Sequence, residues 1–290
     1  KKMIALIGTV ICSTLLLVIF RAFEKFQIDT FQAIVVNYFT AFLCGVIIYS
    51  ADIKSSILDD LSWIPFIGVS SVLFISLFII MAKSAQKNGI ASTSVAVKMS
   101  MGISVLGMIV IYNEAISLLK ISGILLALTG VFLLAKPDHK ANKRNASYML
   151  VILFFGSGLL DLNLNYAQNV ALSNLSPSLF TAFGFGAAGT IGMCVYLVQC
   201  IRSKQQPILS KNIIAGIILG IPNYYSIYFI LQSYSSLDWN DSSVLAVANV
   251  SIVILSIVVG LLVFKEHANR IKIIGISCAI LAIFLLYLSS

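Results

Sequence analysis

Two charged residues of this sequence stand inside long apolar stretches, where a charge is costly. Lys98 lies in the apolar run 90–111, and Asp161 lies in the run 147–168. A charge at the depth of a bilayer costs at least ~2.5–3.5 kcal/mol on insertion scales, so such residues usually have a partner or a function. An ammonium and a carboxylate could pair with each other or together bind a substrate. The carboxylate could also carry a proton, because desolvation favours its neutral form and a nearby lysine favours its charged form.

Structural alternatives exist for both charges. The lysine side chain could extend to the membrane interface, and each charge could pair separately with backbone carbonyls or hydroxyls. Against this, the two runs begin on the same side of the membrane, and at 1.5 Å per residue the two Cα atoms differ in depth by roughly 9 Å. A lysine side chain spans much of that distance. We therefore expect Lys98 and Asp161 to face a common central cavity.

Further polar residues within apolar runs are candidates for lining this cavity: Asn165, Asn223, Tyr228 and Asn249. Asn165 follows Asp161 by one helical turn and shares its face. Pro222 frees a backbone carbonyl beside Asn223, and in a membrane such a group is tolerated only against protein or a water-filled cavity. A lone asparagine, as at Asn37, Asn223 or Asn249, is more often an interhelical hydrogen bond than a ligand contact.

Composition shows which elements must position these residues. Hydrophobic residues make up 59% of the 290 residues, charged residues 10%, and the mean hydropathy is +1.01. Soluble domains carry roughly 25% charged residues. One crossing needs roughly 20 apolar residues, so the length allows about ten. The apolar runs lie at approximately 3–22, 31–50, 62–83, 90–111, 119–136, 147–168, 177–200, 211–233, 241–263 and 271–288.

One motif occurs twice at an offset of 152 residues, which indicates two copies of a five-helix unit. The first copy has Glu114, Lys120 and Gly123, and the second has Glu266, Lys272 and Gly275. The charges suit an interfacial turn and the glycines suit close packing. With five helices each, the halves 1–137 and 147–290, joined by the linker 138–146, must cross the membrane in opposite senses and form inverted repeats.

The sequence resembles the EamA-type branch of the drug/metabolite transporter superfamily. The supporting segments are Ala91-Ser92-Thr93-Ser94-Val95-Ala96 leading into Glu114, and Asp241-Ser242-Ser243-Val244-Leu245-Ala246 leading into Glu266. The resemblance implies an all-α membrane protein of ten transmembrane helices. It also implies two inverted repeats around a central cavity formed by helices 1, 3, 4, 6, 8 and 9, and alternating access.

We therefore expect a secondary active transporter in the inner membrane, an exporter of a small polar or amphiphilic metabolite such as an amino acid, with Asp161 as the candidate for proton coupling. The alternatives are a uniporter or exchanger of a nucleotide-, sugar- or drug-like compound and, with less support, an intramembrane enzyme. No nucleotide-binding motif, catalytic group, cofactor or metal site is predicted. The expected partners are the substrate and the lipid bilayer, with no nucleic acid.

Two properties stay open. Gly184, Ala188 and Gly192 form a small-residue seam, which predicts close packing either within the bundle or between protomers, so the protein is a monomer or a homodimer. The resemblance implies cytoplasmic termini, yet only about four lysines and arginines fall on the side of the termini and about fourteen fall on the opposite side. The positive-inside rule would therefore reverse the orientation.

Overall fold

The computed structural model describes residues 2–53, 57, 59–112, 117–135, 144–170, 175–203, 208–237, 241–266 and 269–288. Within these ranges the regular structure is helical, without strands. The α-helices are α1 (Lys2–Lys25), α2 (Thr30–Ile48), α3 (Ile64–Lys87), α4 (Ile90–Met99), α5 (Met101–Tyr112), α6 (Leu118–Ala135), α7 (Arg144–Val170), α8 (Pro177–Ser203), α9 (Ser210–Ser236), α10 (Asp241–Leu262) and α11 (Arg270–Leu288), and a short 3-10 helix η1 covers Ser50–Asp52.

Seven stretches in the described part of the chain are long and apolar enough to cross a membrane. They are α1, α2, α3, α7, α8, α9 and the continuous stretch formed by α4 and α5. Shorter apolar segments lie within α6, α10 and α11. The chain is therefore an all-α membrane protein, as its composition predicts.

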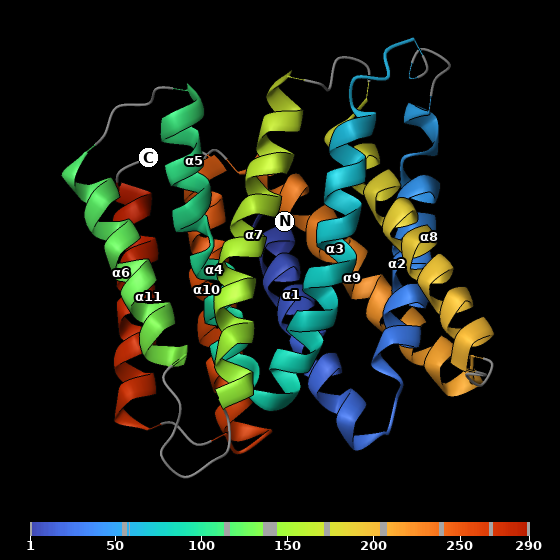
Figure 1. The fold of residues 1–290 in the computed structure, drawn as a ribbon. Coiled ribbons are helices and arrows are strands. Elements are labelled where there is room, and N and C mark those ends of the chain that lie inside the picture. The colour runs from blue at the N-terminus through green and yellow to red at the C-terminus, as the bar shows by residue number, and fades with distance from the viewer. Residues whose placement is uncertain are drawn as a thin grey trace.

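The helices run up and down through one bundle (Figure 1). At the lower end in this view, α1, α3, α6, α8 and α10 end, and α2, α4, α7, α9 and α11 begin. We call this the lower end and the opposite one the upper end. Because α4 and α5 follow one another in the same direction, they act as two segments of one membrane crossing.

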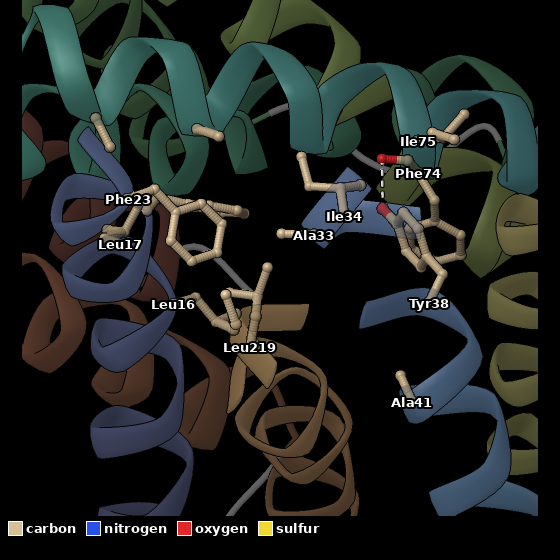
Figure 2. Close-up of a cluster of buried hydrophobic side chains, with 14 of the residues drawn as sticks. Leu16, Leu17, Phe23, Ala33, Ile34, Tyr38, Ala41, Phe74, Ile75 and Leu219 are labelled. Atoms are coloured by element: carbon tan, nitrogen blue, oxygen red, sulfur yellow. Dashed lines mark hydrogen bonds between the residues drawn. The ribbon is translucent and has the colours of Figure 1, made fainter. Parts of the chain in front are cut away.

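A buried aromatic cluster joins α2, α3 and α8. Tyr38 is fully buried, and its hydroxyl donates a hydrogen bond of 2.6 Å to the carbonyl of Phe74 (Figure 2). The ring of Phe185 from α8 packs against both side chains. Since a buried tyrosine hydroxyl needs a hydrogen-bond partner, this bond fixes the register of α2 against α3.

The small-residue seam of α8 is used inside the bundle. A Cβ atom at Gly192 would lie 2.6 Å from Cδ1 of Ile75 and 2.8 Å from Cγ2 of Val35, and one at Gly184 would lie 3.2 Å from Cε2 of Phe74. The glycines therefore let α8 approach α2 and α3 closely. Of the two uses that the sequence left open, the structure shows packing within one chain.

Helices α6 and α11 pack against each other through a similar close approach. A Cβ atom at Gly130 would lie 3.0 Å from the carbonyl oxygen of Gly275, a residue of the duplicated motif. Gly123, the corresponding glycine of the first copy, is buried within α6. These contacts agree with the packing role that the sequence suggests for the motif glycines.

The sequence predicts one helix over 90–111, but in the structure this crossing is interrupted at Ser100 and consists of α4 and α5. The hydroxyl of Ser100 donates to the carbonyl of Val97 at 2.5 Å. A serine side chain that bonds to nearby backbone competes with the regular helical pattern, and no proline or glycine at the break marks it in the sequence. The other notable shift is in α7, which begins at Arg144, three residues before the predicted start of its apolar run.

Candidate functional site

The break between α4 and α5 is held against α7 by serine side chains. The hydroxyl of Ser100, which donates to the carbonyl of Val97, also lies 3.5 Å from Oδ2 of Asp161. One turn later, the hydroxyl of Ser104 donates to the carbonyl of Gly158 at 3.3 Å. Because α4 has 10 residues, the break lies about 15 Å along the crossing, close to the middle of a bilayer.

Asp161 is exposed on the inward face of α7. It follows Ser157, Phe154 and Leu150 by 4, 7 and 11 residues, and these three are 8%, 1% and 1% exposed. Such spacings place all four on one helical face. The large exposed apolar residues of α7 lie on the opposite face: Tyr148, Val151, Ile152, Phe155, Leu159 and Val170. The carboxylate is therefore reached from within the bundle and not from the lipid side.

Lys98 lies close to this carboxylate. Its side chain is half-buried, and its ammonium interacts electrostatically with Asp161. Within the described residues, the two groups do not form an ion pair within 4.0 Å. The lysine donors and the carboxylate oxygens are thus available to water or to a solute between them.

Asn249 reaches the same break from α10. It is 6% exposed, and its Nδ2 lies 4.0 Å from Sδ of Met101, the first residue of α5. The structure therefore brings together three of the predicted site residues, Lys98, Asp161 and Asn249, around the interruption of one membrane crossing. Sequence reasoning missed Ser100, for which a hydroxyl between two apolar helical segments was the only signal.

The other candidates lie elsewhere. Asn165 is on the upper half of α7, where its carbonyl and its Oδ1 accept hydrogen bonds from Asn169 at 3.0 and 3.3 Å. Asn223 is 3% exposed and donates to Oδ1 of Asn37 at 3.2 Å. This bond joins α9 to α2, so Asn223 makes the interhelical contact that is the usual role of a lone asparagine. Tyr228 is half-buried in an aromatic group.

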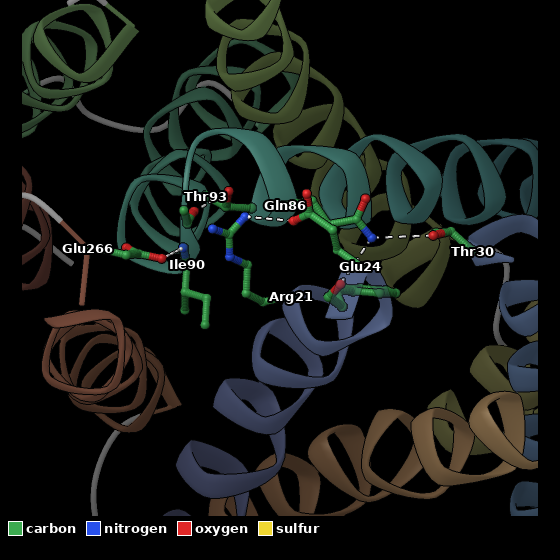
Figure 3. Close-up of polar contacts among 9 residues, drawn as sticks. Arg21, Glu24, Thr30, Gln86, Ile90, Thr93 and Glu266 are labelled. Carbon is green, nitrogen blue, oxygen red and sulfur yellow. Dashed lines mark hydrogen bonds and ion pairs between the residues drawn. The ribbon is translucent and has the colours of Figure 1, made fainter. Parts of the chain in front are cut away.

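The glutamate of the second motif copy caps a helix of the other half of the chain. Oε1 of Glu266 accepts the N–H of Ile90 at 2.7 Å, and Oε2 lies 3.5 Å from the N–H of Ala91 (Figure 3). A carboxylate at this position satisfies unpaired N–H groups and complements the positive end of the α4 dipole. Glu114 lies outside the described residues, as do the side chains of Lys120 and Lys272.

Around this cap, polar contacts lie at the lower end of the bundle, both within α1 and between α1 and α3. Arg21 and Glu24 form an ion pair of 3.2 Å, and Nε2 of Gln86 on α3 donates to the carbonyl of Phe20 at 3.1 Å. Helix α1 accordingly packs against α3 and α4. Helix α7 packs against α3, α4, α5 and α6 but does not pack comparably against α9 or α10 in the part of the chain that the structure describes.

No protein-family model matches the chain. A Haemophilus influenzae protein described as "Uncharacterized protein" is 30% identical over 293 residues, with 97% of each chain covered. A solved structure described as "Crystal structure of protein" superposes with a TM-score of 0.58, covering 97% of this chain and 98% of that one at 10% identity. This structural likeness supports the fold alone.

Proposed function

The chain belongs to the same family as the Haemophilus influenzae protein, and we propose that it is a secondary transporter of a small polar or amphiphilic metabolite, such as an amino acid. The observation that carries the proposal is the exposure of Asp161 on the inward face of α7, beside Lys98 and the helix break. Ionisable residues at membrane depth that face the bundle interior are typical of substrate and ion pathways.

An inverted repeat of five crossings is part of the proposal, as in the EamA-type drug/metabolite transporters. Exchanging the two halves relates α1 to α7, α2 to α8, α3 to α9, α4–α5 to α10, and α6 to α11. The observed packing supports this relation: α2–α9 corresponds to α3–α8, α1–α9 to α3–α7, and α1–α10 to α4–α7. The pairs α2–α8, α4–α10 and α6–α11 correspond to themselves. Ten crossings related in this way are the architecture of many secondary transporters.

Alternating access is supported by the difference between corresponding helix pairs. Helix α1 packs against α3 and α4 near the lower end, while the corresponding pairs of α7 with α9 and α10 are less closely packed. Two copies of one unit thus adopt different arrangements. A transporter of this kind opens to the other side when the two halves exchange their arrangements.

Coupling to a proton gradient would act through Asp161. Desolvation favours the neutral carboxyl, and the Lys98 ammonium favours the carboxylate. A solute that binds Lys98 or expels water would change this balance, so proton and substrate occupancy would depend on each other. A uniporter or an exchanger would use the same residues for binding alone.

The test is solute uptake by purified protein in proteoliposomes, using panels of labelled amino acids, nucleosides and sugars with and without a pH gradient. We expect gradient-dependent uptake of one class. Asp161→Asn and Lys98→Met should each lower it at least tenfold. Asp59→Asn removes an exposed carboxylate outside the site and should leave uptake unchanged. Full uptake by both site variants would contradict the proposal.

A further inference from the structure

Basic residues are concentrated at one end of the bundle. Of the nineteen lysines and arginines, fourteen belong to helix ends or connections at the lower end and four to the upper end, with Lys98 between them. Acidic residues show the opposite bias, with four at the lower end and six at the upper end. The lower end therefore has a formal charge of +10 and the upper end of −2.

The acidic groups at the lower end do little to neutralise this charge. Oδ1 of Asp29 accepts the N–H of Gln32 and caps α2, and Glu266 caps α4. Glu24 forms an ion pair with Arg21. Two of these three carboxylates thus compensate helix N-termini and not basic side chains.

The basic side chains at the lower end project outward. In the described part of the chain seven of them are exposed, and they come from four helix connections: Lys25, Lys83, Lys87, Arg202, Lys211, Lys265 and Arg270. Lys211 donates to the backbone carbonyl of Gln27 at 2.8 Å, a contact that leaves its charge uncompensated. The result is a broad positive surface at the membrane interface.

We propose that this surface lies against the anionic cytoplasmic leaflet, so that the chain ends of this bundle, at the upper end, face away from the cytoplasm. Lysines and arginines in short connections set the orientation of membrane proteins, and clusters of them bind the negative surface of the cytoplasmic leaflet. This orientation is the reverse of the one that the resemblance to EamA-type transporters implies. The lower end, near which α1 packs against α3 and α4, would then be the cytoplasmic end.

The orientation follows from charge and topology alone, so it does not depend on the proposed transport function. Together with that function, it has a consequence for access. In the arrangement of this structure, the exposed carboxylate of Asp161 would be reached from the non-cytoplasmic side.

Reporter fusions test the orientation directly in a bacterial host. Because α11 ends at the upper end, a C-terminal alkaline phosphatase should be active and a C-terminal green fluorescent protein dark. A fluorescent fusion with inactive phosphatase would overturn the proposal, and so would activity of both reporters. These results are independent of any uptake measurement.

A charge variant tests whether the basic surface sets the membrane orientation. Replacing Lys83, Lys87, Arg202 and Arg270 together by glutamine should reduce C-terminal phosphatase activity per molecule of membrane-inserted protein by at least half. The control replaces Asp59 and Asp60 at the upper end by asparagine and should keep the original orientation. If the quadruple variant inserts with unchanged orientation, the basic surface does not set it. If that variant fails to insert, the fusions of the unaltered chain still decide the orientation.

Discussion

Gly89 offers a quantitative test of the cap at the start of α4. Its φ of +91° and ψ of 164° lie in a region that is open essentially only to glycine, and another residue there costs about 1–3 kcal/mol. A Cβ atom at Gly89 would also lie 2.6 Å from Cδ of Glu266. In Gly89→Ala the carboxylate must therefore move away from the N–H groups that it caps.

Loss of the cap adds to the backbone strain. Removing an N-cap costs about 1 kcal/mol, and loss of a negative charge at a helix N-terminus costs about 0.3–1 kcal/mol. The expected destabilisation of Gly89→Ala is thus about 2–5 kcal/mol. In a Glu266→Ala background, Gly89→Ala should destabilise the protein only through backbone strain, because the cap is already absent. The two substitutions should therefore couple by about 1–2 kcal/mol.

Thermal unfolding of the purified protein in detergent, followed by size-exclusion chromatography at one heating rate, measures these effects. Domains of 150–250 residues lose about 2–4 °C for each kcal/mol, so Gly89→Ala should lower the midpoint by at least about 4 °C. Gly68→Ala is the matched control, because a Cβ atom there has no neighbour within 4 Å and alanine favours the helix. Equal midpoints for Gly89→Ala and Gly68→Ala, or the same loss in both backgrounds, would refute the reasoning.

Three further outcomes are expected. Replacing Asn37 and Asn223 separately by leucine should each cost about 0.6–1.7 kcal/mol, and the double variant should cost less than the sum, as a double-mutant cycle of unfolding would show. Gly130→Ala places a Cβ atom 3.0 Å from a backbone carbonyl of α11. The resulting overpacking should cost about 1–3 kcal/mol and so lower the unfolding midpoint by a few degrees. Asp161→Asn should remove any dependence of residual uptake on the pH gradient, whereas a persistent dependence would exclude this carboxyl as the proton carrier.

The membrane-spanning character was predictable because it depends on composition. Apolar runs of about 20 residues predict crossings without knowledge of their partners, and the structure shows seven long apolar stretches in the described residues. The spacing of Gly184, Ala188 and Gly192 likewise predicted close packing. Whether that seam packs within the chain or against another copy depends on the shape of the facing helices, which a single sequence does not show.

The break at Ser100 and the partners of the asparagines were not predictable from the sequence. An interruption after Met99 arises from the backbone contact of one hydroxyl and from the approach of α7, and a run of apolar residues does not reveal either. Asn37 and Asn223 are 186 residues apart and form one pair. From the sequence, Asn37 and Asn223 could be considered only as two separate residues, because a sequence does not show which helices pack against each other.

The cap and the site are linked through α4 itself. This helix of 10 residues begins at the N–H groups held by Glu266 and ends at Ser100, whose hydroxyl contacts Asp161. We expect a helix this short, with contacts at both ends, to move as a unit, so a displacement at its lower end would shift Lys98 relative to Asp161. The glutamate comes from the connection between α10 and α11, in the other half of the chain. Opening of the lower end by movement of one half against the other would therefore alter the distance between the two charges in the same step.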